Sequence, residues 1–289
     1  MIESISKVEV RRIVSNRSAI WEQLMAAGRL PDGAIELAPT ALSLAALDRP
    51  EGSPEPYRSH LAALAADVAA LGHRGGDLEG RAWAIARVLY ERHGYSGDRD
   101  TYDDLRNADL MSVIDRRKGI PVSLGILYAH IGRAMGWTIV GLNFPSHFLL
   151  RLEGKGLRLI VDPFDCGRIV APEDLRALAK SVFGTDAELD RSWFEPVGNR
   201  EILLRLQNNI RTRSIQSGEL ERGAEITRRM MALAPGAPNL QRDLGMVEAH
   251  MGNVGAAIEA LANYLQTGPR GEDKAEVEKM LTKLRQALN

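Results

Sequence analysis

A run of almost uncharged residues between Gly119 and Gly136 constrains the fold of this chain more than any other stretch. Within it, residues 121–135 read PVSLGILYAHIGRAM and carry one charged side chain, Arg133. A helix that is apolar almost all round is buried inside a domain. Pro121 suits its first turn, where the missing N–H is not needed, and Gly136 can end it. The sequence therefore predicts a buried helix around which a domain is organised.

Small residues recur at helical spacing along one side of this predicted helix. They are Gly125, Ala129, Gly132 and Gly136. Because glycine leaves room for a close neighbour, we expect another stretch of backbone to approach this side of the helix.

Three segments that follow the helix have the composition of β-strands. Residues 137–144 are rich in β-branched and aromatic side chains, and residues 147–152 and 157–163 flank a turn at residues 153–156. Together they predict a short antiparallel sheet next to the helix.

A hairpin that is symmetric about this turn would bring His147 opposite Asp162. Leu152 then faces Leu157, and counting outward places the imidazole and the carboxylate on the same face of the sheet. An imidazole oriented by a carboxylate is part of a nucleophilic triad. His147 and Asp162 are therefore the main candidate catalytic residues, and this inference depends on the register.

A triad also needs a nucleophile, and the N-terminus of a helix is the natural place for one because the helix dipole lowers a thiol pKa there. That place holds Pro121, Val122 and Ser123, and the only cysteine of the chain, Cys166, follows the hairpin. Ser123 and Cys166 are thus the candidate nucleophiles. The alternative is that both are structural and that His147 and Asp162 form a retained buried pair.

Basic residues directly precede the predicted helix. Arg116 and Arg117 could form a positive rim that receives an acidic partner. The competing interpretation is a solvated turn in which Asp115 pairs locally, since exposed charges are usually only solvated.

The C-terminal third contains an internal repeat. Leu206, Gly218 and Pro235 recur as Leu240, Gly252 and Pro269, each 34 residues further on, which is the tetratricopeptide period. The repeat predicts two helix pairs and a capping helix, at residues 199–216, 221–233, 238–250, 255–267 and 272–287.

Such arrays present concave surfaces to peptides or proteins. The polar residues Asn208, Asn209 and Arg242, on the first helix of each repeat, are the candidate partner contacts in the array. The alternative is that so short an array only buttresses the rest of the fold.

The N-terminal part differs from the rest. Residues 1–34 read as an arm with Arg11, Arg12 and Arg17 among β-branched residues, and Gly28 to Gly33 reads as a linker. The arm could dock on a partner or a membrane surface, or pack as a helix on its own domain. We expect a core domain over residues 35–197 and a helical domain over residues 198–289.

Composition excludes several classes of function. The net charge is -1, so a general polyanion binder is not expected, and one cysteine excludes an intramolecular disulfide. No apolar run approaches the ~20 residues of a membrane span, and no signal core is evident, so we expect a cytoplasmic protein.

Three histidines precede the buried helix, His60, His73 and His93, and their spacing is not that of metal ligands. We expect them at the surface or at helix caps. We expect no metal and no other cofactor.

The order of a helix, a strand with His147 and a strand with Asp162 resembles the transglutaminase-like core, a relative of papain-type folds. The segments DRRKGIPVSL, PSHFLLRL and VDPFDCG resemble the bacterial SirB-type family, named as regulators of sirC expression. That family joins a transglutaminase-like domain to C-terminal tetratricopeptide repeats, and the resemblance covers roughly Ile35 to the C-terminus. It implies an α+β fold with a transglutaminase-like (papain-like) core, N-terminal helices and a C-terminal helical array.

In catalytic transglutaminase-like proteins a cysteine opens the helix, and the matching position here falls near Pro121 to Ser123. His147 and Asp162 match the other two triad positions. We therefore predict a non-catalytic protein, with a regulatory role, that binds a protein or peptide partner through its cleft and its array and does not bind nucleic acid directly. The alternatives are a hydrolase or acyl transferase using Ser123 or Cys166, and a structural adaptor; the oligomeric state is left open.

Overall fold

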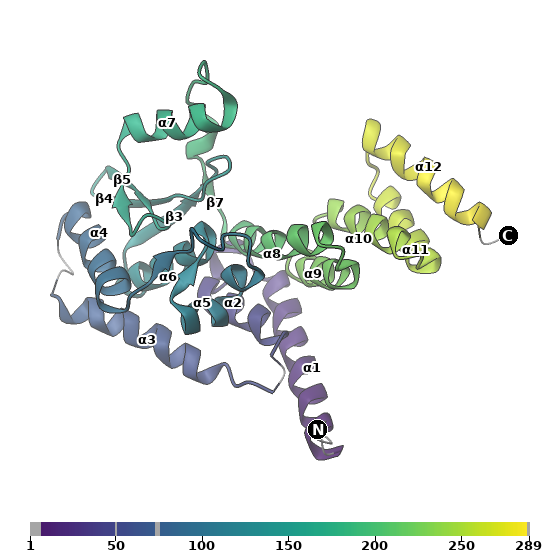
Figure 1. Ribbon diagram of the computed structural model, residues 1–289, viewed down its shortest axis with the longest axis horizontal. Helices are drawn as coiled ribbons and strands as arrows, with labels where there is room; N and C mark the ends of the chain where they lie inside the picture. Colours follow the sequence, from purple (N-terminus) through teal and green to yellow (C-terminus); the bar gives the residue numbers. More distant parts are fainter. Residues whose placement is uncertain (1–6, 50, 73–75, 288–289) are drawn as a thin grey trace. The chain divides into compact units, whose positions relative to one another are not determined.

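The computed structural model describes residues 7–49, 51–72 and 76–287, and its course is drawn in Figure 1. The chain divides into two compact units. The first comprises residues 31–206 together with the N-terminal part up to Ile20, and the second comprises residues 21–30 together with the C-terminal part from Gln207.

The first unit contains a sheet of five strands in the order β6-β5-β4-β3-β7, and all neighbouring pairs are antiparallel. A separate parallel pair, β1 with β2, joins the loop after the N-terminal helices to the start of the buried helix. The strands are β1 (Ser96–Gly97), β2 (Lys118–Gly119), β3 (Thr138–Leu142), β4 (Leu150–Gly154), β5 (Leu157–Asp162), β6 (Arg168–Ile169) and β7 (Pro196–Val197).

The predicted buried helix is α6 (Pro121–Ala134), and nearly all of its residues are buried. Its glycines do not admit another backbone, so that expectation was wrong. A Cβ added at Gly125 would overlap the ring of Phe148, and one added at Gly132 would overlap the side chain of Ile139. The small residues therefore make room for large side chains from the sheet region.

Helix α6 contacts three other helices of the first unit, α2, α3 and α4, as well as strand β3 (Figure 1). Asp77 caps one of them by accepting a hydrogen bond from the Gly80 N–H, as its sequence position suggests. The helices are α2 (Leu37–Ala46), α3 (Glu55–Ala70), α4 (Leu78–Ala86), α5 (Leu110–Arg116) and α7 (Pro172–Phe183), with single turns η1 (Asp32–Ala34), η2 (Arg87–Arg92), η3 (Leu105–Ala108) and η4 (Arg191–Phe194).

The β4–β5 hairpin has a tighter turn than the sequence suggested. Leu152 pairs with Leu159 instead of Leu157, and the turn consists of Lys155 and Gly156. Both residues have positive φ, 51° and 78°, which two-residue hairpin turns with the correct twist require. The register is thus displaced by two residues, and an even displacement keeps each side chain on its expected face.

The N-terminal arm forms one helix, α1 (Lys7–Arg29), whose residues belong partly to each unit. Of the linker expected from Gly28 to Gly33, Gly28 and Arg29 lie within this helix, and the boundary between the two units falls after Leu30. A Cβ at Gly28 would overlap the carbonyl oxygen of Ala232, so the absence of a side chain permits a close contact within the second unit. The side chains of residues 7–14, including Arg11 and Arg12, lie outside the described residues.

The repeat helices agree with the predicted spans to within one residue. Gly218 and Gly252 occupy equivalent turns and both have positive φ, 83° and 77°. The helices are α8 (Asn199–Gln216), which begins in the first unit, α9 (Leu220–Leu233), α10 (Asn239–His250), α11 (Val254–Gln266) and α12 (Glu272–Ala287).

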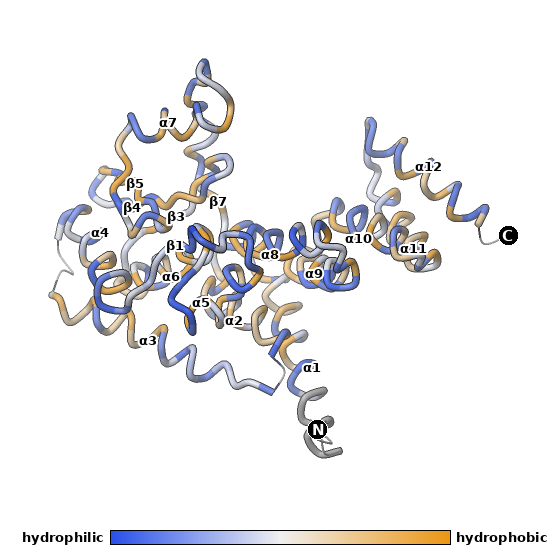
Figure 2. The backbone as a smooth tube through the Cα atoms, in the orientation of Figure 1, coloured by the Kyte–Doolittle hydropathy of each residue, from blue (hydrophilic) through white to orange (hydrophobic). Residues whose placement is uncertain are grey.

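Helix α12 has the amphipathic character expected of a capping helix, visible as alternating apolar and polar stretches in Figure 2. Val277, Leu281 and Leu284 are buried in one cluster with Ala257 and Leu261 of α11. Among the described residues, no helix combines the length and the apolar composition needed to cross a bilayer.

Candidate functional site

His147 and Asp162 are in direct contact. The Nε2 atom of His147 lies 2.8 Å from Oδ2 of Asp162, and their side chains are 20% and 8% exposed. The other carboxylate oxygen accepts hydrogen bonds from the backbone N–H groups of Phe164, at 2.8 Å, and Asp165, at 3.2 Å. Although the expected register was displaced and His147 lies before β4, the structure brings these two side chains together.

The charge state of Asp162 follows from this environment. Burial alone would raise the pKa of the carboxyl group, but the hydrogen bond and charge of His147 and the two backbone N–H groups outweigh it and hold the pKa below its ordinary value. The carboxylate is therefore ionised at neutral pH. It fixes the Nε2 side of the imidazole and leaves Nδ1 as the nitrogen that could accept a proton.

The pair lies beside the N-terminal half of α6. Phe148, next to His147, and Pro163, next to Asp162, would both meet a Cβ placed on Gly125. A nucleophile on the first turn of α6 would therefore be in the neighbourhood of the imidazole.

The first turn of α6 offers no such nucleophile. Pro121 and Val122 are apolar, and Ser123 is completely buried. The Ser123 hydroxyl accepts a hydrogen bond from the Ile120 N–H at 3.1 Å and lies 2.8 Å from the Asn107 carbonyl oxygen, to which it donates. Ser123 thus caps the helix and is not hydrogen-bonded to His147.

Cys166 lies on an exposed turn with a φ of 50°. Partial burial of the thiol and the neighbouring Asp165 carboxylate raise its pKa. Reactive cysteines have the opposite shift, because a nearby positive charge or helix N-terminus lowers the pKa. Within the described part of the chain, neither Cys166 nor Ser123 makes a hydrogen bond to the His147 ring.

A buried polar cluster that the sequence analysis missed adjoins the start of α6. Asp98 is completely buried and accepts hydrogen bonds from the Thr101 hydroxyl, at 2.7 Å, and from Arg116, at 2.9 Å. Arg116 also donates to the side chain of Asn107 at 2.9 Å. Burial would raise the pKa of Asp98, but these hydrogen bonds outweigh it and lower the pKa below its ordinary range. The D-x-x-T spacing of Asp98 and Thr101 was the available signal.

The interpretation of Asp115 as pairing locally was wrong. Its carboxylate accepts hydrogen bonds from Arg49, at 2.8 Å, and from the hydroxyl of Tyr57, at 3.1 Å. Both partners lie more than fifty residues away in sequence and precede or begin α3. Arg116 is likewise engaged inside the domain, which leaves Arg117 as the basic residue of this motif that lines an open hollow.

His93 caps η2, as one of the two expectations for these histidines had it, and both His93 and His60 are half-buried and make polar contacts. The rings of His60 and His93 lie 5.5 Å apart, His93 contacts Asp67 at 2.6 Å, and His60 contacts the Tyr95 hydroxyl at 2.9 Å. His73 lies outside the described residues. Within those residues, no group of three or more His, Cys, Asp or Glu side chains is arranged to hold a metal ion.

The candidate contacts in the array bind other residues of the array. Asn208 accepts from Arg211 at 2.7 Å, Asn209 accepts from Arg213 at 3.3 Å, and Arg242 pairs with Asp273 at 2.6 Å. The two asparagine contacts lie within α8, whereas the Arg242–Asp273 ion pair joins α10 to α12.

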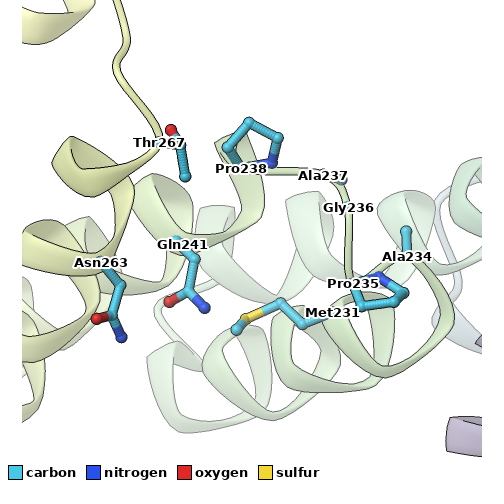
Figure 3. A pocket seen from close by; sticks show the side chains of 9 residues that line it. All are labelled: Met231, Ala234, Pro235, Gly236, Ala237, Pro238, Gln241, Asn263 and Thr267. Carbon is cyan, nitrogen blue, oxygen red and sulfur yellow. The ribbon is translucent and has the colours of Figure 1, made fainter.

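A hollow of about 420 Å³ lies close to these helices, at the turn between α9 and α10. Figure 3 shows Met231 extending toward the amide of Gln241, with Asn263 of α11 nearby. Pro235 and Thr267 also line the hollow. The sequence analysis did not single out these residues.

Comparison with known proteins assigns both parts of the chain to families. Residues 55–208 match the family model of the transglutaminase-like superfamily, and residues 210–282 match a tetratricopeptide repeat. The chain is thus an α+β protein with a transglutaminase-like domain followed by tetratricopeptide repeats, which confirms the predicted fold class.

The chain belongs to the UPF0162 protein family. It is 35% identical over 189 residues to a UPF0162 protein of Xylella fastidiosa strain Temecula1, covering 64% of this chain and 67% of the relative. It is 34% identical over 217 residues to one of Vibrio cholerae, covering 74% and 79%. A shorter stretch of 82 residues is 43% identical to mouse F-box only protein 21, covering 28% of this chain and 13% of that protein. No solved structure matches.

Proposed function

We propose that this protein is a non-catalytic member of the transglutaminase-like superfamily that binds a protein or peptide partner and has a regulatory role. The main support is the first turn of α6. Pro121, Val122 and the buried, fully hydrogen-bonded Ser123 occupy the place where catalytic relatives have a cysteine. A histidine and a carboxylate without an adjacent thiol or hydroxyl can rigidify this region but lack the nucleophile of acyl transfer.

The repeat array supports a binding role. Tetratricopeptide repeats commonly mediate protein–protein contacts, and the hollow beside Met231 combines this apolar side chain with the amides of the half-buried Gln241 and the exposed Asn263. Amides beside an apolar surface suit a peptide, whose backbone both donates and accepts hydrogen bonds. The single cysteine fits a reducing compartment, so we place this function in the cytoplasm. We also propose that the chain is a SirB-type regulator whose effect on expression is indirect.

The binding proposal is tested with the full chain carrying an affinity tag at native expression. Asn263→Arg introduces a long charged side chain into the array hollow. Gln266→Arg makes the same change three residues further along α11, at an exposed position that does not line the hollow. Quantitative mass spectrometry should find a partner that is lost with Asn263→Arg and retained with Gln266→Arg. Equal recovery with both variants, or no partner with the native chain, would contradict binding through the array.

The alternative, an acyl transferase or hydrolase, is tested by covalent labelling. A phosphonate probe should not label Ser123, and an alkylating probe should label the exposed Cys166 at the same rate with and without His147. The reason is that neither nucleophile is hydrogen-bonded to the imidazole. Labelling of either residue that is abolished by His147→Ala would show an active nucleophile and overturn the non-catalytic proposal.

A further inference from the structure

A second open hollow lies in the first unit, away from the residues of the His147–Asp162 pair. It has a volume of about 630 Å³ and is lined by residues that precede and begin α3 and by residues of α5. Its apolar wall includes Pro56, Met111 and Ile114, and Tyr57 and Arg117 supply polar groups. The polar lining also includes charged side chains, among them Arg49, Glu51 and Asp115. A volume of this size is typical of sites for small organic ligands, and the charged groups would decide which ligand chemistry fits.

Among the described residues, Arg117 is the cation of this hollow that lacks a counter-ion. The other guanidinium, that of Arg49, is 2.8 Å from Asp115 and 2.7 Å from the Ser112 hydroxyl. Among the residues that the structure describes, Arg117 has no carboxylate within ion-pair distance. Glu51 at the rim is the hollow's remaining acidic residue and makes no ion pair with Arg117.

The hydrogen bonds of Arg117 all use one of its three nitrogen atoms. Nη1 lies 3.0 Å from Nε2 of His60, 2.6 Å from the Tyr95 hydroxyl and 2.6 Å from the Ile114 carbonyl oxygen. The guanidinium also lies over the Tyr95 ring, 4.8 Å from its centroid. These contacts hold the group in place and leave Nε and Nη2 without a hydrogen bond in the described part of the chain. Those two N–H groups form the edge that binds a carboxylate through two parallel bonds.

The backbone at Arg117 adds a second observation. It caps α5 in the left-handed conformation, with a φ of 58° and a ψ of 21°. Glycine or asparagine is the usual residue at such a cap, because other side chains are disfavoured in the left-handed conformation. An arginine here therefore occupies a position that its backbone disfavours, and sparsely populated conformations of this kind concentrate at ligand sites.

We propose that this hollow binds a carboxylate group, held by the Nε and Nη2 atoms of Arg117, with the organic body of the ligand against Pro56, Met111 and Ile114. A carboxylate fits better than a phosphate because one free guanidinium balances one negative charge. Arg49 is already neutralised by Asp115, and the Glu51 carboxylate opposes a second negative charge. The ligand is either a free organic acid or the carboxylate of a peptide, and this proposal does not depend on partner binding by the repeat array.

The test is an NMR titration of the full chain with matched pairs of ligands. In the free-acid arm, propionate and 3-phenylpropionate are compared with their amides. In the peptide arm, a short apolar peptide with a free C-terminus is compared with its amidated form. Inorganic phosphate at equal ionic strength is the third ligand. Titration to about 20 mM detects the millimolar dissociation constants expected of a single two-point contact. We expect each acid that binds to shift the Arg117 and His60 resonances, and its amide to bind at least tenfold more weakly. Tighter binding of the organic acids would identify a free acid as the ligand, and tighter binding of the peptide would identify a peptide carboxylate.

Variants separate a specific contact from general charge. Arg117→Lys keeps the charge but removes the two-point edge and should weaken acid binding about tenfold, whereas Arg58→Gln, which removes an exposed charge near the start of α3, should change nothing. Phosphate binding as strongly as the acids, equal binding of acids and amides, or no shift with any acid would overturn the proposal. The comparison of acids with amides uses the native chain, so it remains decisive if Arg117→Lys does not fold.

Discussion

The first unit contains two histidines whose neighbours have opposite charge, His147 beside a carboxylate and His60 beside a guanidinium. The Asp162 carboxylate accepts a hydrogen bond from the imidazole of His147, and the pKa of Asp162 is lowered as a result. At His60, burial and the positive charge of Arg117 lower the pKa to about 4. The His147–Asp162 pair is suited to activating a nucleophile, which α6 lacks. Burial and the Arg117 charge keep the His60 ring neutral, so that the ring can accept a hydrogen bond from Arg117. One residue type thus has two roles, and the neighbouring charge decides between them.

The largest expected effect is at the carboxylate. Asp162→Ala would leave the His147 ring and the N–H groups of Phe164 and Asp165 without their acceptor. We expect the free energy of unfolding to fall by about 3 kcal/mol, measured by urea denaturation. Asp165→Ala is the matched control in the same turn, because it removes only partly exposed ion pairs and should cost less than about 1 kcal/mol. Equal losses would mean that the pair at His147 is not a structural centre.

The two sites should lose stability in different pH windows. The pKa of His60 is about 4 in the folded chain and about 6.5 in the unfolded chain. Between pH 6.5 and pH 4 the unfolded chain therefore binds a proton at His60 that the folded chain does not. The free energy of unfolding falls as the pH is lowered through this window. Discounted for the exposure of the ring, the loss is about 1–2 kcal/mol. Asp162 has a lowered pKa in the folded state, so its contribution is present above the ordinary carboxyl pKa and is lost only as the pH falls below it.

His60→Gln tests this separation, since glutamine keeps a hydrogen-bond acceptor but does not titrate. Chemical unfolding at pH 7, 5 and 3 should show that the variant removes the loss between pH 6.5 and 4 and leaves the loss at lower pH. If the native chain and the variant have parallel profiles, His60 is not kept neutral in the folded protein.

A smaller effect is expected when the guanidinium itself is removed. Arg117→Gln should raise the pKa of His60 by about one unit, while burial, the larger cause, keeps it below its ordinary value. His93 and Asp67, which also act on this ring, are unchanged by the substitution. NMR titration of the imidazole resonances measures the shift, and the His147 resonance in the same spectra is the internal control. An unchanged His60 pKa would show that the Arg117 charge does not reach the ring.

The smallest effect is expected at the thiol. Cys166→Ser should change the free energy of unfolding by less than about 0.5 kcal/mol, because the side chain is exposed and makes no hydrogen bond to His147. Thermal unfolding of the two proteins at the same pH measures this. A loss comparable to that of Asp162→Ala would place Cys166 within the His147 site after all.

Local patterns in the sequence predicted the features that depend on local spacing. The repeat helices follow from a 34-residue period, and α6 follows from its uncharged run between two glycines. The proximity of His147 and Asp162 was also predicted, although the Lys155–Gly156 turn displaced the register by two residues. The even displacement keeps the strand residues on their expected faces, and His147 contacts Asp162 from the segment before β4.

Features that depend on partners distant in the chain could not be predicted in this way. Asp98 meets Arg116 across 18 residues, and Asp115 meets Arg49 across 66. The sequence contains many Arg and Asp residues, and nothing in their spacing indicates which of them pair. The free edge of Arg117 is recognisable only after these other pairs are known.

The contact between Gly28 and Ala232 has a practical consequence for dissecting the molecule. Residues 21–30 belong to the same compact unit as the repeats, although nearly two hundred residues separate them in the chain. A fragment that starts at either family match, at residue 55 or 210, would lack this helical segment and leave one side of α9 uncovered. Truncations, domain swaps and split tags should therefore keep residues 21–30 with the array, and a fragment without them would report on a damaged surface.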